Sequence, residues 1–233
     1  MKTFVMKKAV LLASLIMMTP LLASAQSRFS VAPALGFYKA ELDKLVDFLG
    51  EIEKLGVEVQ KPNGGLQFGG RLNYEKSPQL TLRAEAYYWQ DQGNGNLRDV
   101  DGTLSFANKV RLVPIMLGAQ YNFGQPEAKI RFYAGASGGV MLVKTQSQIA
   151  LNLADPNEES IEELTESSGS DFIGKPFVGL ELGTSRKLAF FTEVGYVFGK
   201  FTSEEADLET GEPTSLDISI NGLHLIGGMK IAF

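Results

Sequence analysis

The chain has 233 residues, 44% of them hydrophobic, no cysteine and a formal net charge of −5. The lack of cysteine excludes a disulfide framework and thiolate metal sites. The acidic balance argues against a nucleic-acid partner, which would need a basic face.

The first 25 residues predict a secretory signal peptide. A basic start precedes a short apolar run at residues 9–18, which is too short for a membrane-spanning helix. Small residues up to Ala25 predict cleavage there, which leaves residues 26–233 as one mature domain. Loss of the three lysines before that site takes the net charge from −5 to −8. An uncleaved anchor helix is the alternative, and Pro20 disfavours it.

Eight later segments alternate between apolar and polar residues. A period of two indicates a β-strand with one apolar face. No other apolar run reaches about 18 residues, so membrane insertion must come from strands. The predicted strands cover residues 29–37, 66–74, 80–88, 113–123, 130–142, 178–182, 188–198 and 223–233.

The connections between these strands alternate in length. Short turns at one end and long loops at the other are typical of transmembrane barrels, with the turns periplasmic and the loops extracellular. Such long loops are unusual in a compact soluble domain. Tight turns are expected at residues 75–78, 124–127 and 185–186, and long loops at 40–64, 90–107, 145–171 and 200–214.

Aromatic residues gather at both ends of the predicted strands, with aliphatic residues between them. Two such girdles are what the two lipid–water interfaces select. The turn end has Phe29, Tyr74, Tyr121, Phe123, Phe132, Phe190 and Phe233, and the loop end has Phe37, Phe68, Tyr88, Tyr196 and Phe198.

The last strand alternates strictly and ends on the aromatic Phe233. With eight strands and alternating connections, the chain resembles the small outer-membrane β-barrel proteins of the porin family, which include the OmpA transmembrane domain, OmpX and OmpW. The resemblance implies an all-β, eight-stranded antiparallel up-and-down transmembrane β-barrel in the bacterial cell outer membrane. It also implies contact with outer-membrane lipid and lipopolysaccharide, and recognition of Phe233 by the barrel-assembly machinery.

One irregularity is expected in the closing strand. Ile218 and Ile220 have the opposite parity to Leu223 and Leu225. A phase slip near residues 221–222 would explain this, either as a β-bulge or as the end of the membrane belt.

The first long loop predicts an amphipathic helix over residues 41–56. Its apolar residues recur at helical spacing. Packing on the barrel rim is favoured over docking on the outer leaflet or on a partner. The apolar positions are Leu42, Leu45, Val46, Leu49, Ile52 and Leu55.

The polar parity of the strands carries charged residues among many glycines. On the lipid face each charge would cost about 2–4 kcal/mol at the midplane, so these residues are expected inside. An eight-stranded barrel is just wide enough for side chains to fill, so we expect an ion-pair network that plugs the lumen. A polar path for small solutes or ions is the alternative. The predicted network is Arg71, Arg83, Glu85, Arg131, Lys175, Glu181, Glu193 and Lys230.

Catalytic, cofactor and metal sites are not expected. His224 is the single histidine, and a hydrolytic triad would need a serine and a carboxylate beside it. Its neighbours do not resemble a lipid A deacylase motif, and its parity points inward.

Acidic clusters in the third and fourth long loops suggest solvated loops. Divalent cations shared with lipopolysaccharide are the alternative. The acids are Asp155, Glu158, Glu159, Glu162, Glu163, Glu166, Asp171, Glu204, Glu205, Asp207, Glu209 and Glu212.

The predicted function is a non-enzymatic outer-membrane barrel with a structural, adhesive or envelope-stress role and an extracellular partner surface on its loops. A narrow channel, a lipid A-modifying enzyme and a soluble lipocalin-like barrel are the alternatives. In a lipocalin-like barrel the charged parity would form the outer wall and the aromatic residues would fill the apolar interior. The length of the strands, the two aromatic girdles and Phe233 favour the membrane barrel instead.

Overall fold

The computed structural model describes residues 28–54, 56–99, 102–125, 128–153, 161–183, 187–206 and 213–233. The predicted signal peptide, residues 1–25, and its cleavage site at Ala25 lie outside these ranges. The predicted tight turn at residues 185–186 also lies outside them, as do residues 126–127 of the turn predicted at 124–127.

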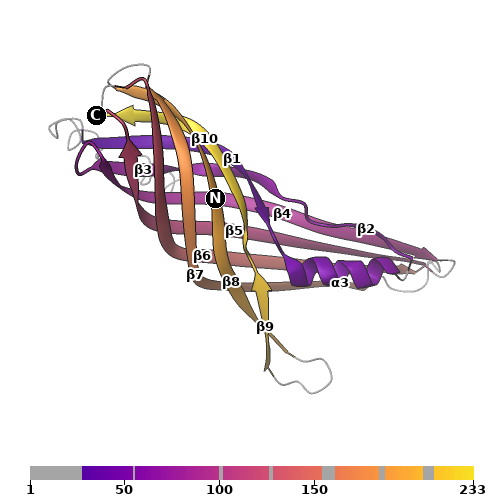
Figure 1. Ribbon diagram of the computed structural model, residues 1–233. Coiled ribbons are helices and arrows are strands. Elements are labelled where there is room, and N and C mark those ends of the chain that lie inside the picture. The colour runs from indigo at the N-terminus through magenta and orange to yellow at the C-terminus, as the bar shows by residue number, and fades with distance from the viewer. Residues whose placement is uncertain are drawn as a thin grey trace, which may run out of the picture.

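Within the described ranges, eight antiparallel strands form a closed barrel wall (Figure 1). Each strand pairs with its neighbour in the chain, and β10 pairs with both β8 and β1, which closes the ring. The predicted eight-stranded up-and-down fold is confirmed. The wall strands are β1 (Phe29–Ala40), β3 (Gly65–Glu75), β4 (Leu80–Asp99), β5 (Gly102–Phe123), β6 (Ile130–Leu153), β7 (Ile161–Gly183), β8 (Leu188–Ala206) and β10 (Gly222–Ala232).

The strands are staggered around the barrel. If the paired residues are followed from Phe29 through each strand in turn, the register returns to β1 at Lys39, a shift of ten positions. This stagger tilts the strands, and it brings residues far apart in the sequence to the same height in the lumen.

Side chains alternate between the outside and the interior of the wall. On β1, Ala32 and Ala34 are buried, whereas Leu35 is exposed. The outer face is apolar throughout its central part, with Leu66 and Phe172 each 80% exposed. An apolar surface of this extent requires lipid around it. This arrangement excludes the soluble lipocalin-like alternative.

Aromatic side chains pair at both ends of this apolar belt. Their ring centroids lie about 5 Å apart, which is ordinary aromatic contact. The pairs at the turn end are Phe29–Tyr74 at 4.9 Å and Tyr121–Phe123 at 5.2 Å, and those at the loop end are Phe68–Tyr88 at 5.1 Å and Tyr196–Phe198 at 4.7 Å.

The long segments at the loop end are mostly strand rather than irregular loop. β4 and β5 stay paired out to Asp99 and Gly102, and β6 and β7 out to Leu151 and Ile161. The strands from β4 to β8 have 19 to 24 residues, although a membrane crossing needs only about 9–11. Outside the lipid both faces of a strand can be polar, so these segments lack the alternation that predicts a strand. Their backbone groups are satisfied by pairing with the neighbouring strand.

The projecting strands separate into two arms (Figure 1). β7 and β8 are paired only up to Ile173 and Gly199. Beyond that point β8 pairs with β9 (Pro213–Ser219), which forms the smaller arm. The larger arm contains the ends of β4 to β7, with the short β2 (Glu58–Gln60) added to β4.

The closing strand contains no bulge, so that prediction is wrong. β8 keeps one register past the break between β9 and β10, because Gly222 faces Val197 and Ser219 faces Lys200. Ile220 is buried on the same inward parity as His224, because the interior becomes apolar at this height. The structure agrees with the other expected explanation, an end of the membrane belt at this point, because Leu223 is the last exposed apolar residue on the outer face of β10.

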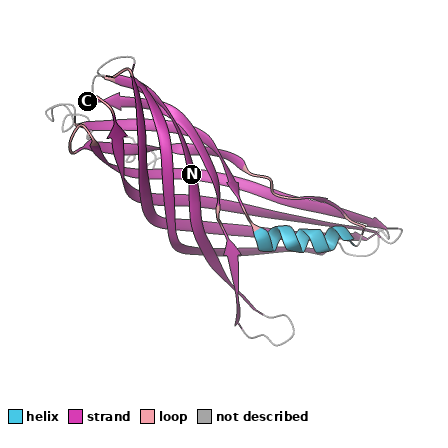
Figure 2. Ribbon diagram, viewed as in Figure 1, coloured by secondary structure: helices cyan, strands magenta, loops and turns pink. Residues whose placement is uncertain are grey.

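The amphipathic helix predicted in the first long loop is present as α3 (Asp43–Lys54). It lies along the projecting strands (Figure 2), and it contacts β2 and β9. Leu49 is fully buried, and a Cβ at Gly93 of β4 would lie only 2.9 Å from its Cδ1. Gly93 therefore leaves the space that the helix uses to pack on the protein's own arm. None of the described helices is long and apolar enough to cross a membrane.

Candidate functional site: the barrel interior

The largest charged cluster in the interior is centred on Glu193 of β8. Its carboxylate accepts hydrogen bonds from Arg71 Nη1 at 2.7 Å and from Arg83 Nη1 and Nη2 at 2.7 and 2.9 Å. Lys175 Nζ lies 3.4 Å from the same group. The cations come from β3, β4 and β7, so the contacts span the lumen. All four side chains are at most 1% exposed.

Glu85 extends this cluster on β4. It accepts hydrogen bonds from Arg83 at 2.5 Å, from Lys175 at 2.9 Å and from the Tyr87 hydroxyl at 3.2 Å. Two carboxylates thus bind three cations. Buried charges are tolerated only when they are paired and hydrogen-bonded.

Aromatic rings hold the two guanidinium groups in place. The Arg71 guanidinium carbon lies 3.7 Å from the Phe191 ring centroid, and that of Arg83 lies 3.9 Å from Phe177. The flat, weakly hydrated guanidinium group can stack on a ring while its edge binds carboxylates. Lysine could not replace arginine here with the same geometry.

A second cluster lies closer to the turn end. Lys230 contacts Glu181 at 3.1 Å and Glu75 at 3.0 Å, and Arg131 also pairs with Glu181. All eight charged residues expected in the lumen therefore lie on the inner face, five in the first cluster and three in the second. Glu75 was not among them, although its parity with Arg71 points to the same face.

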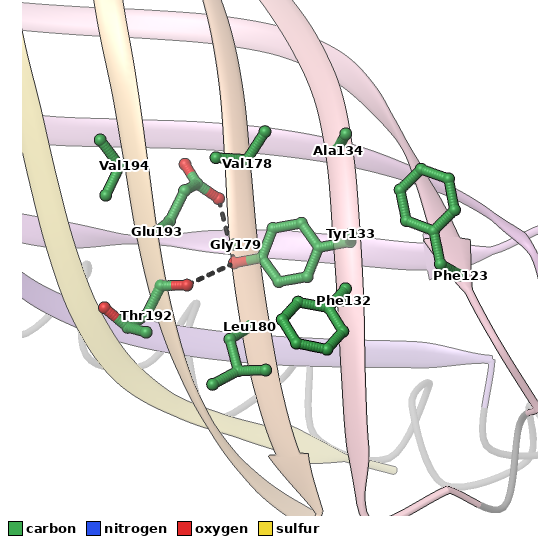
Figure 3. Close-up of a pocket in the computed structure, with 10 residues that line it drawn as sticks. All are labelled: Phe123, Phe132, Tyr133, Ala134, Val178, Gly179, Leu180, Thr192, Glu193 and Val194. Carbon is green, nitrogen blue, oxygen red and sulfur yellow. Dashed lines mark hydrogen bonds between the residues drawn. The ribbon is translucent and has the colours of Figure 1, made fainter.

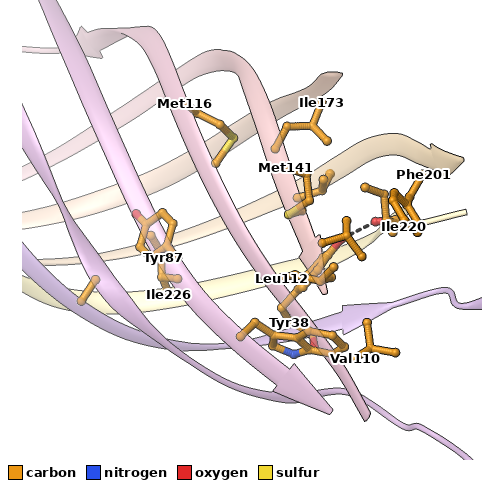
Figure 4. Close-up of a cluster of buried hydrophobic side chains, with 14 of the residues drawn as sticks. Tyr38, Tyr87, Val110, Leu112, Met116, Met141, Ile173, Phe201, Ile220 and Ile226 are labelled. Carbon is orange, nitrogen blue, oxygen red and sulfur yellow. Dashed lines mark hydrogen bonds between the residues drawn. The ribbon is translucent and has the colours of Figure 1, made fainter. Parts of the chain in front are cut away.

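An apolar cluster fills the interior on the loop side of the charges (Figure 4). Trp89 is a buried member of this cluster, and its Nε1 donates to the Tyr38 carbonyl at 2.9 Å. The Tyr38 hydroxyl donates to the carbonyl of Ile220. Sequence reasoning missed this apolar cap. Its members include Tyr38, Trp89, Leu112, Met116, Met141, Ile173, Phe201 and Ile220.

His224 lies between the charged cluster and the apolar cap. Its Nε2 is 2.9 Å from the side-chain nitrogen of Gln67, and the rings of Tyr38 and Tyr87 pack edge-on against it. Its hydrogen-bond partner is thus an amide, not the serine or carboxylate of a hydrolytic triad.

Acidic groups that could hold a metal ion do not come together in the part of the chain that the structure describes. Residues 155, 158, 159, 207, 209 and 212 lie outside it, and the side chains at 162, 163, 204 and 205 are also not described. Glu166, which is described, pairs with Lys144 at 2.7 Å.

A pocket of about 410 Å³ opens on the wall across β6, β7 and β8 (Figure 3). Its lining includes the exposed, lipid-side residues Phe132 and Val178. At its floor, Gly179 makes room for Tyr133, because a Cβ there would lie 2.2 Å from the ring. The Tyr133 hydroxyl donates to Glu193 at 3.2 Å, and Glu193 is itself among the lining residues, so the pocket borders the charged cluster.

A closed antiparallel barrel with a lipid-side apolar belt and a charged interior defines a bacterial outer-membrane β-barrel protein. Residues 24–204 match the family model described as an outer membrane protein beta-barrel domain, and the chain belongs to this family. The protein is therefore located in the outer membrane, as predicted.

The chain is similar to several solved structures at low sequence identity. The outer membrane protein OprG from Pseudomonas aeruginosa is 16% identical, with 89% of this chain and 96% of that chain covered and a TM-score of 0.54. Neisserial surface protein A is 11% identical, with 89% and 98% covered and a TM-score of 0.48. Ail of Yersinia pestis, solved with the heparin analogue sucrose octasulfate, is 9% identical, with 88% and 99% covered and a TM-score of 0.39. No curated protein matches the chain in sequence.

Proposed function

We propose that the protein is a non-enzymatic, non-conducting outer-membrane barrel with a structural, adhesive or envelope-stress role. The observation that carries this proposal is the doubly closed lumen. The ion pairs around Glu193 fill the middle of the barrel, and the apolar cap fills the loop side. A channel would need a continuous hydrated path, and both layers oppose one.

The role at the cell surface belongs to the projecting arms. The larger arm carries four long strands with α3 packed beside them, which is a more rigid surface than free loops. We assign any extracellular partner to this surface.

We further propose that outer-membrane lipid, including lipopolysaccharide, surrounds the apolar belt of the barrel wall. Residues 1–25 act as the signal peptide and are cleaved at Ala25. The barrel-assembly machinery recognises Phe233. This residue is partly exposed, and its backbone N–H donates a hydrogen bond to the Phe29 carbonyl at 3.1 Å.

The closed lumen predicts the absence of stable single-channel steps in a planar lipid bilayer. The full barrel would be refolded in detergent, its folding checked by heat-modifiable gel mobility, and its conductance recorded beside a known porin. Reproducible steps from the wild-type protein would support the narrow channel instead.

His224 lacks a nucleophile and a carboxylate partner, so His224→Ala is expected to leave lipid A chemistry unchanged. Mass spectrometry would compare lipid A from cells that express the wild-type protein, the variant or neither. A modification that requires the wild-type protein and disappears in the variant would establish the lipid A-modifying enzyme and remove the non-enzymatic proposal.

A further inference from the structure

Cations mark the loop-side edge of the lipid-facing wall. On four strands, the first outward residue beyond the apolar stretch is basic: Lys39 on β1, Arg111 on β5, Lys144 on β6 and Lys200 on β8. The corresponding residues on β4 and β7 are Gln90 and Ser170, so none of these six strands carries an acid there. This pattern runs against the composition of the chain, whose formal charge is −5.

Arg111 and Lys144 form the centre of this edge. They face each other directly in the register of β5 and β6. Their Cβ atoms are therefore about 5 Å apart on the same face, a spacing at which like charges destabilise the sheet. Lys109 follows two residues along β5, on the same face as Arg111.

Among the side chains that the structure describes, one acid, Glu166, faces these cations. Glu166 lies 2.7 Å from Lys144 Nζ and also accepts a hydrogen bond from Gln146. These hydrogen bonds hold the pKa of the Glu166 carboxyl below its ordinary value, so it is ionised at neutral pH. Arg111 Nε is buried without a hydrogen-bond partner. Lys109, Arg111, Lys144 and Glu166 together carry a net charge of +2, and the cluster has one N–H donor without an acceptor.

The wall beneath the cluster is suited to acyl chains. Leu142 and Ile115 lie exposed one step below Lys144 and two steps below Arg111 on the same faces, and Phe172 is exposed on β7 nearby. A ligand that binds both the cationic cluster and the apolar wall below it must be an amphiphile, with an anionic head group next to its hydrocarbon chains. Arginine suits phosphate in particular, because its fork can donate two parallel hydrogen bonds.

We propose that Arg111, Lys144 and Lys109 bind a phosphate group of lipopolysaccharide in the outer leaflet, with the lipid A acyl chains against Leu142 and Ile115. The proposal deepens the lipid contact proposed above. It does not depend on a closed lumen, so the conductance experiment and the experiment below can fail independently.

The test measures lipid A binding to the full barrel in detergent, by the rise in its thermal unfolding midpoint during titration. The ligands are bisphosphorylated lipid A, chemically dephosphorylated lipid A and inorganic phosphate. The variant Arg111→Gln/Lys144→Gln removes the two central charges. Lys54→Gln/Lys61→Gln is the matched control, because it removes two extracellular charges that pair with Glu51 and Glu53 away from this wall.

Wild type and control are expected to bind phosphorylated lipid A equally. The Arg111/Lys144 variant should bind it about tenfold or more weakly, because it loses the charge-assisted hydrogen bonds to the phosphate. Dephosphorylated lipid A should bind the wild type as weakly as phosphorylated lipid A binds the variant. Arg111→Lys/Lys144→Arg should retain most of the affinity.

Equal affinity of the variant and the wild type would overturn the proposal, as would equal binding of both lipids to the wild type. If inorganic phosphate alone gave the whole stabilisation, the site would bind free phosphate and the lipid assignment would be wrong. Heat-modifiable mobility reports whether the variant is folded. If it were not, the comparison of the two lipids on the wild-type protein would decide the question.

Discussion

Replacement of Glu193 by glutamine is expected to lower the free energy of unfolding of the barrel by about 3–5 kcal/mol. The Glu193 carboxylate binds both arginines of the cluster and lies close to Lys175, and all of these side chains are buried. The amide keeps the volume of the side chain but removes its charge. Glu85 would then be the single acid of a buried cluster with three cations, whose side chains are at most 1% exposed.

The measurement is urea unfolding of the refolded barrel in detergent micelles or lipid vesicles. The matched control is Glu166→Gln, which removes the acid of an exposed pair on the larger arm and should leave the stability close to that of the wild type. If both variants lost the same amount of unfolding free energy, or if Glu193→Gln lost none, the interior ion pairs would not be what stabilises the barrel.

Replacement of Trp89 by alanine is expected to cost about 3–5 kcal/mol of stability. Trp89 is 1% exposed within the apolar cap and donates its indole N–H to the Tyr38 carbonyl. Removal of the ring leaves a cavity on the loop side of the lumen. The charged cluster beneath it stays intact, so this variant should still not conduct ions.

The same unfolding measurement applies, with Leu164→Ala as the control, because that side chain is 61% exposed on the larger arm and should contribute only about 0.5 kcal/mol. Conductance recordings on Trp89→Ala add a second readout. Wild-type stability in Trp89→Ala would show that the cap does not stabilise the barrel, and ion flow would show that the ion pairs alone do not seal it.

The wall of the barrel could be predicted from the sequence because lipid contacts the outward-facing residues of every wall strand and imposes the same apolar character on them. Ile115 and Leu117 alternate with inward residues, and the lipid admits only apolar side chains at the outward positions. The projecting strands could not be found in this way. At Thr145 and Gln146, for example, both faces are polar, and only pairing with the neighbouring strand reveals the strand.

The members of the charged interior could also be predicted, but their partners could not. Arg71 and Glu193 are 122 residues apart and meet across the lumen. The apolar cap was missed for a related reason: Leu112 and Val113 are both apolar, so the alternation that separates inside from outside disappears at that height. The proposed phosphate cluster likewise depends on the register that places Arg111 opposite Lys144.

The sequence by itself determined the class of protein, the side of each wall strand that faces lipid and the end of the barrel that carries the long connections. These are local properties, because a period of two and the length of a turn can both be recognised from consecutive residues. Only the tertiary structure decided which charges pair, where the lumen is capped and how far the strands project. Those features depend on the stagger of ten residues that accumulates around the closed ring, and no single strand contains that information.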